Sequence, residues 1–163
     1  MRKIPFSPPD ISEAEIAEVA EAMRSGWITT GPRVKELEKR LAAYCHTSKV
    51  VCLNSATAAE ELNFRICGIG EGDEVIVPAY TYTATASAAI HCGAKVIFVD
   101  IRPDTMNIDE NKIEAAIIEK TKAIVPVHYA GVSCEMDKIM ELAEKYHLLV
   151  IEDAAQGIMS TYK

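Results

Sequence analysis

The sequence has few aromatic residues, no long apolar run and no cluster of basic residues. Aromatic residues make up 6% of the 163 positions, and tryptophan occurs once. The longest apolar runs have the length of a strand, far below the roughly twenty residues of a membrane span. Lysine and arginine number 17 against 24 acidic residues, which gives a formal net charge of −7. We therefore expect neither a membrane nor a nucleic acid as a partner.

The cysteines also lack a pattern. Five occur, an odd number, and no two have the two-residue spacing of a zinc or redox motif. We expect no metal site, and we expect these thiols to be small buried side chains in a reduced cytoplasm. No apolar run follows the N-terminal residues 1–5, so the sequence gives no sign of a signal peptide. The cysteines are Cys45, Cys52, Cys67, Cys92 and Cys134.

Short apolar runs alternate with helical patterns over most of the chain, and 49% of the residues are hydrophobic. The predicted strands are 50–53, 74–77, 95–99, 123–127 and 148–151. The predicted helices between them are 57–67, 81–92, 109–119 and 136–146. This alternation predicts an α/β fold of three layers, αβα, around a mostly parallel sheet. Ligands of such sheets bind at the carboxyl ends of the strands, so the residues after each strand are candidates.

Two helices are predicted before this alternating region. Ser12 and Glu15 have the spacing of a capping box, and apolar residues follow at helical intervals. A loop with the single tryptophan, 26–32, comes next. It ends in Pro32, which suits the first turn of a second helix.

Asp153 follows the last predicted strand directly. A carboxylate at such a position is costly to bury unless a cation or several donors meet it. We suggest a protonated pyridine nitrogen as that cation, because an acidic partner keeps such a ring charged. The alternative is that Asp153 caps the following turn, a role for which aspartate is well suited.

Other strand ends offer matching groups. Residues 54–57 are small and open a helix, so Ser55, Ala56 and Thr57 could hold a phosphate on free amides, although serine and threonine there are also ordinary caps. Tyr82 could stack on a heteroaromatic ring or could simply pack the next helix. Gln156 could donate its amide to a ring oxygen. Together these groups describe a pyridoxal phosphate (PLP) site better than a nucleotide site.

Several segments resemble the DegT/DnrJ/EryC1/StrS sugar aminotransferases, which are PLP enzymes of fold type I. The similarity runs from Ile4 to the last residue. It rests on the segments 25–32, 54–58, 68–76, 126–131 and 152–156. The tryptophan loop, the Ser-Ala-Thr sequence and the Pro-Val-His-Tyr-Ala-Gly segment are similar to the branch that aminates UDP-4-keto sugars.

The resemblance implies roles for the candidate residues. Asp153 would pair with the ring nitrogen, Gln156 would contact the phenolic oxygen, and Tyr82 would stack on the ring. Ser55, Ala56 and Thr57 would hold the phosphate. The loop with Thr29 and Thr30 would lie near the sugar, and we add Trp27 and His128 as substrate-binding candidates.

The resemblance further implies a homodimer that transfers an amino group from glutamate to a nucleotide-linked keto sugar. Residues 1–33 would form an N-terminal helix and substrate-side loop, and 34–163 would be part of the large PLP-binding domain, with the C-terminal domain absent. The family's Schiff-base lysine is expected beyond Lys163, so we expect no catalytic residue in this chain. The chain could then be a non-catalytic fragment, or belong to a PLP-dependent sugar dehydratase of the same family.

One helix departs from the family pattern. Glu60, Glu61, Asn63 and Arg65 stand where the family is mostly apolar or small. We expect a packing cost at Glu60 and Arg65 if they face the sheet.

Overall fold

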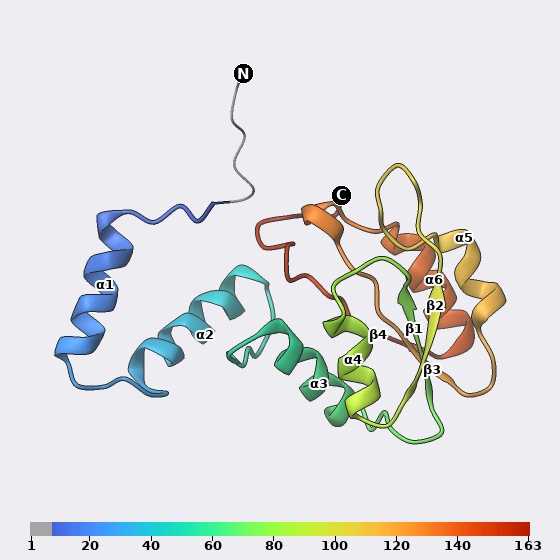
Figure 1. Ribbon diagram of the computed structural model, residues 1–163, viewed down its shortest axis with the longest axis horizontal. Coiled ribbons are helices and arrows are strands. Elements are labelled where there is room, and N and C mark those ends of the chain that lie inside the picture. The colour runs from blue at the N-terminus through green and yellow to red at the C-terminus, as the bar shows by residue number, and fades with distance from the viewer. Residues whose placement is uncertain (1–7) are drawn as a thin grey trace. The chain divides into compact units, whose positions relative to one another are not determined.

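The computed structural model describes residues 8–163 and divides the chain into two compact units (Figure 1). The first is Met1–Cys52 and the second is Leu53–Lys163, and each is described by itself. The predicted division of roles at residue 33 stays a prediction. No helix among residues 8–163 combines the length and apolar character that a bilayer crossing requires.

The first unit consists of two helices, α1 (Glu13–Arg24) and α2 (Pro32–Tyr44). The predicted capping box is confirmed: the Ser12 hydroxyl accepts a hydrogen bond from the Ala14 amide, and the Glu15 carboxylate accepts one from the Ser12 amide at 2.6 Å. Pro32 is the first residue of α2, as predicted. Neither helix has a buried residue in this structure.

The second unit is built on a sheet of four strands in the order β2-β1-β3-β4. All three strand pairs are parallel, which confirms the predicted sheet type. Ile76 lies at its centre, opposite Ile97 on one side and Ile124 on the other. The strands are β1 (Glu74–Pro78), β2 (Lys95–Val99), β3 (Thr121–Ile124) and β4 (Leu149–Val150).

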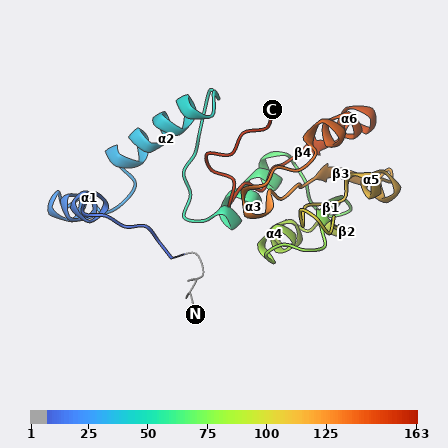
Figure 2. The same cartoon turned by 90° about the horizontal axis from the view of Figure 1, so that it is seen from above.

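Helices cover both faces of this sheet, so the predicted three layers are present (Figure 2). On one face, Phe64 of α3 and Ala88 of α4 pack with Val75 and Val77. On the other face, Ile139 of α6 packs with Ile76 and Ile124 in a second cluster. The helices are α3 (Ala56–Ile66), α4 (Ala84–His91), α5 (Glu110–Ile113) and α6 (Met136–Tyr146), with short 3₁₀ turns at Glu114–Ala116 and Tyr129–Gly131.

Two predicted elements are wrong. Residues 50–53 do not form a strand, and Val51 is 57% exposed. An apolar run becomes a strand only when a neighbouring strand supplies backbone hydrogen bonds. Among the described residues, the only hydrogen bond of this segment goes from the Cys52 amide to the Glu38 carboxylate. The helix predicted over 109–119 ends early, because Ile117 turns to an extended conformation with ψ of 127°.

The carboxyl ends of β3 and β4 run on side by side beyond the last paired residues. Val127 and Asp153 form an isolated parallel bridge. The Asp153 amide donates to the Pro126 carbonyl at 2.9 Å, and the His128 amide donates to the Asp153 carbonyl at 3.1 Å. These backbone bonds bring His128 and Asp153 to the same edge of the sheet.

Candidate active site

Asp153 is buried, with 9% of its surface exposed. One carboxylate oxygen accepts a hydrogen bond from the Thr85 hydroxyl of α4 at 2.8 Å. The other accepts the Ala155 amide at 3.1 Å, so Asp153 also caps the turn after the strand. The capping interpretation is therefore confirmed, and the pairing of Asp153 with a ring nitrogen stays a prediction. A carboxylate can accept about four hydrogen bonds, so two acceptor positions remain for a ligand.

Glu60 of α3 faces this carboxylate. It is 5% exposed, and among the described residues no group other than the Asp153 carboxyl shares a hydrogen bond with its oxygens. Burial, followed by the negative charge of Asp153, raises the pKa of Glu60 to about 8. Glu60 is therefore protonated at neutral pH. Glu60 is buried, which is the condition for the expected packing cost, whereas Arg65 is exposed and pairs with Glu61 at the surface.

The N-terminus of α3 lies one turn before Glu60. Ser55 caps it by accepting the Ala58 amide at 3.1 Å. The first two amides of the helix, Ala56 and Thr57, have no carbonyl to pair with inside the helix. Thr57 and Glu60 are three residues apart, a rise of about 4.5 Å along the helix axis. The helix N-terminus therefore lies one turn from the residue of α3 that faces the Asp153 carboxylate.

Tyr82 and Asp153 are connected through Thr85. The Thr85 amide donates to the Tyr82 carbonyl at 3.3 Å, while its hydroxyl donates to Asp153. The Tyr82 side chain is 79% exposed, so its ring faces are open to a ligand. The alternative role of Tyr82, packing α4 onto the sheet, does not fit this exposure.

Only the oxygen of the Gln156 side-chain amide takes part in a hydrogen bond among the described residues. Its oxygen accepts the Ala130 amide at 2.8 Å, and this bond fixes which way the side-chain amide points. Ala130 has a left-handed backbone conformation, with φ of 53°. No hydrogen bond from the Gln156 nitrogen occurs within residues 8–163, and its donation to a ring oxygen stays a prediction.

Both ring nitrogens of His128 are already engaged. Nδ1 accepts the Cys134 amide at 3.2 Å, so the proton is assigned to Nε2, which lies 2.7 Å from a Glu152 oxygen. This contact lowers the pKa of Glu152. The ring itself is 8% exposed. In this arrangement His128 offers no free nitrogen to a substrate, and the exposed group of the pair is Glu152.

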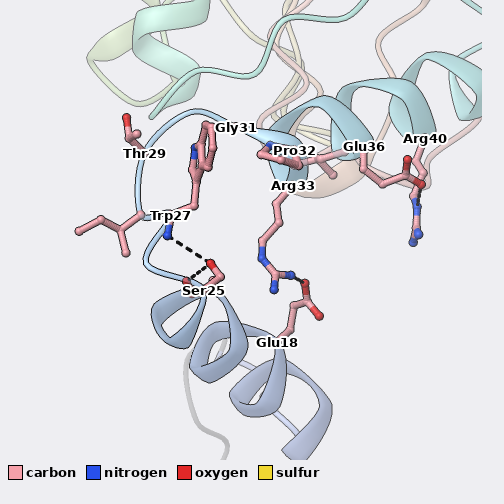
Figure 3. Close-up of a pocket in the computed structure, with 12 residues that line it drawn as sticks. Glu18, Ser25, Trp27, Thr29, Gly31, Pro32, Arg33, Glu36 and Arg40 are labelled. Carbon is pink, nitrogen blue, oxygen red and sulfur yellow. Dashed lines mark hydrogen bonds and ion pairs between the residues drawn. The ribbon is translucent and has the colours of Figure 1, made fainter.

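Trp27, Thr29 and Thr30 lie in the first unit. The Trp27 indole donates to the Thr30 carbonyl at 3.1 Å. Trp27 and Thr29 line a pocket of about 970 Å³ between α1 and α2 (Figure 3). Arg33 and Arg40 also line it, paired with Glu18 and Glu36. The pocket offers an aromatic ring, a hydroxyl and ion-paired guanidinium groups.

Gly31 is required by this loop because the indole ring of Trp27 lies directly against it. A Cβ atom at position 31 would overlap the ring. We expect Gly31→Ala to displace Trp27, break its bond to Thr30 and cost the first unit about 1 kcal/mol. Trp27 is the chain's single tryptophan, so its emission spectrum reports the change directly.

Gly70→Ala is the matched control, since a Cβ there meets the Cys92 carbonyl at an ordinary 3.4 Å. An unchanged emission spectrum in Gly31→Ala would contradict the packing described for Trp27.

Two residues of this region have roles that the sequence patterns do not predict, Thr85 and Glu152. For Thr85 the available signal is its place in the first turn of the helix after a strand, which faces the carboxyl edge of a parallel sheet. Glu152 lies within a family motif. Its position beside Asp153, on the opposite side of an extended chain, was the available signal.

Residues 9–163 match the DegT/DnrJ/EryC1/StrS aminotransferase family. The chain belongs to this family. SpsC, a spore coat polysaccharide biosynthesis protein of Bacillus subtilis strain 168, is 47% identical over 160 residues, which are 98% of this chain and 41% of SpsC. A UDP-4-amino-4-deoxy-L-arabinose–oxoglutarate aminotransferase of Shewanella sediminis is 45% identical over 160 residues, again 98% of this chain and 41% of that protein.

Solved structures of family members share the fold. The PLP form of Spr1654 from Streptococcus pneumoniae superimposes with a TM-score of 0.84 at 52% identity, covering 99% of this chain and 39% of that one. The form of the same protein with pyridoxamine phosphate (PMP) superimposes on this chain with a TM-score of 0.83. The predicted fold class is thereby confirmed. The chain spans about two fifths of the length of the curated relatives named above.

Proposed function

We propose that this chain supplies part of the cofactor site of a PLP-dependent aminotransferase that acts on nucleotide-linked keto sugars, with glutamate as amino donor. One observation supports the proposal: the buried Asp153 carboxylate faces Glu60 of α3, one turn after the free amides of that helix, within a member of this family. PLP, when bound, supplies an electron sink for chemistry at the carbon that carries the amino group.

The residues of the second unit fit PLP. Asp153 holds the proton on the ring nitrogen, and Thr85 fixes the orientation of that carboxylate. Ala56 and Thr57 bind the phosphate through their amides, while Ser55 orders the turn by capping it. Tyr82 is open to stack on the ring.

The remaining polar group is the Gln156 amide. Its oxygen is held by Ala130, so its nitrogen donates to the phenolic oxygen. Each of these contacts binds or orients the cofactor, and none of them transfers the amino group.

The substrate is proposed to meet Trp27, Thr29 and Thr30. An indole can stack on a nucleobase, and hydroxyl groups can bond to a sugar. A nucleotide diphosphate in the pocket of the first unit would replace Glu18 or Glu36 as the partner of an arginine. For His128 we propose an indirect role, in which its Nε2 proton orients the exposed Glu152 carboxylate toward the substrate.

Reversible PLP binding by the chain is the first test. Asp153→Asn is expected to weaken binding by about 10- to 100-fold, because a neutral amide replaces a charge-assisted hydrogen bond worth roughly 1.5–3 kcal/mol. The measurement is a titration with PLP, followed by its absorbance and by calorimetry at pH 7.

Asp137→Asn is the control. Asp137 is an exposed acid on α6 that pairs with Lys163, so its replacement is expected to leave PLP binding unchanged. Equal affinities for the native chain and Asp153→Asn would contradict the proposed site.

Two further properties belong to this proposal. One is a cytoplasmic location, where thiols stay reduced. All five cysteines are free, but only Cys134 is buried, and Cys45 and Cys67 are exposed, so the expectation of buried thiols is wrong for most of them. The apolar residues that α1 leaves exposed, Ile16, Val19 and Met23, agree with assembly into a homodimer, because exposed apolar patches commonly mark interfaces.

A further inference from the structure

Glu60 is the feature of the second unit that the proposed cofactor contacts leave unexplained. Packing alone would favour an apolar side chain at a position that is 5% exposed on the sheet-facing side of a helix. No donor from another group satisfies either carboxyl oxygen within the described residues, and the only group that shares a hydrogen bond with Glu60 is the neighbouring carboxyl of Asp153. A buried polar group without a partner requires an explanation, such as a ligand or a catalytic role.

The group that Glu60 faces is Asp153, and the two carboxyls are surrounded differently. Asp153 has two donors, the Thr85 hydroxyl and the Ala155 amide, which stabilise its ionised form. Glu60 has none. No salt bridge found in residues 8–163 reaches either acid. Two adjacent carboxyls without a cation cannot both ionise readily, so the pair keeps one proton. Because the hydrogen-bond donors surround Asp153 and not Glu60, that proton stays on Glu60.

We propose that Glu60 is a positioning residue that carries the single proton of a carboxyl pair with Asp153, and that this proton is released when PLP binds. The inference rests on the proposed function, since the ligand is the same cofactor. A protonated ring nitrogen beside Asp153 adds a positive charge to the site. That charge favours the ionised form of Glu60, and Glu60 then loses its proton to solvent.

The consequence is a coupling between PLP affinity and pH. In the free chain, burial and the charge of Asp153 hold the pKa of Glu60 at about 8. The bound ring lowers that pKa, because an opposite charge nearby favours the ionised carboxylate. Binding near pH 7 then releases a proton from Glu60. Among residues 8–163, Asp153 is the only titratable group that shifts the pKa of Glu60, so the coupling depends on this pair.

The test counts protons during PLP binding. Calorimetry at pH 7, in buffers of different ionisation enthalpy, is carried out on the native chain, Glu60→Gln and Glu61→Gln. The glutamine keeps the shape and a hydrogen-bond donor but cannot titrate, so it mimics the protonated carboxyl. Because proton release strengthens PLP binding by the native chain at pH 7, we expect the variant to bind PLP about tenfold or more weakly. We expect the native chain and Glu61→Gln to release about one proton more than Glu60→Gln. Protons from PLP itself cancel in this difference.

Equal proton release by the native chain and Glu60→Gln would overturn the inference while leaving the PLP site intact. A structural role for Glu60 would change stability in the variant but would not change the proton count. Absence of PLP binding by the native chain would instead overturn the proposed function. In that case a ¹³C NMR titration of the free chain tests the carboxyl pair. We expect one glutamate carboxyl to titrate near pH 8 in the native chain, and we expect this signal to be missing from Glu60→Gln. Titration of Glu60 below about pH 6 would overturn the pair as well.

Discussion

Glu60→Leu is expected to stabilise the chain by about 2–4 kcal/mol at pH 7. In the native chain Glu60 must take up a proton on folding, because its pKa rises from 4.5 to about 8. Each pKa unit between the working pH and the unfolded value costs about 1.4 kcal/mol. Leucine has a similar size and removes both buried oxygens. Urea unfolding followed by circular dichroism measures the difference.

The sign of the pH dependence follows from the raised pKa. Below about pH 4.5 the carboxyl is protonated in both states and costs nothing. As the pH rises toward 8, the folded state still binds the proton while the unfolded state has lost it, so the free energy of unfolding falls. Above pH 8 this contribution is constant. The gain from Glu60→Leu is therefore expected to be small at pH 5 and largest at pH 8 and above.

Glu61→Leu is the matched control on the next residue of α3. Glu61 is partly exposed and pairs with Arg65, so the change is expected to alter stability by no more than about 0.5 kcal/mol. If Glu60→Leu gave the same gain at pH 5 and pH 8, Glu60 would not be protonated in the folded chain.

Phe64→Ala is expected to destabilise the second unit by about 3–5 kcal/mol. Phe64 has no exposed surface and packs α3 onto Val75 and Val77 of the sheet. Removing the ring leaves a cavity where the helix that carries Ala56 and Thr57 meets the core. Because a domain of this size has a total stability of about 5–15 kcal/mol, the loss is a large share. The measurement is again urea unfolding.

Ile66→Ala provides the comparison on the same helix. Ile66 is 73% exposed, so its truncation removes little packing and is expected to change stability by no more than about 0.5 kcal/mol. A similar loss in both variants would show that α3 does not depend on the contact between Phe64 and the sheet.

The sequence predictions are confirmed where a feature depends on residues close in the sequence, and they fail where it depends on a distant partner. The capping box at Ser12 and the start of α2 at Pro32 depend on neighbours within one turn, and both are confirmed. The strand predicted at 50–53 fails because a strand depends on a partner that its own residues do not specify. The early end of the helix at Ile117 is a similar case, in which the Ile118 amide bonds to the Thr121 hydroxyl at 2.9 Å instead.

The sequence by itself determined the family, the parallel α/β fold and the residues expected at the strand ends, because periodicity and short motifs are local. Only the tertiary structure decided how those residues meet. Thr85 and Asp153 are 68 positions apart and share a hydrogen bond of 2.8 Å. The charge state of Glu60 is set by burial and by a neighbour 93 positions away. Desolvation and Coulomb interactions depend on distance in space, and the order of residues along the chain does not give that distance.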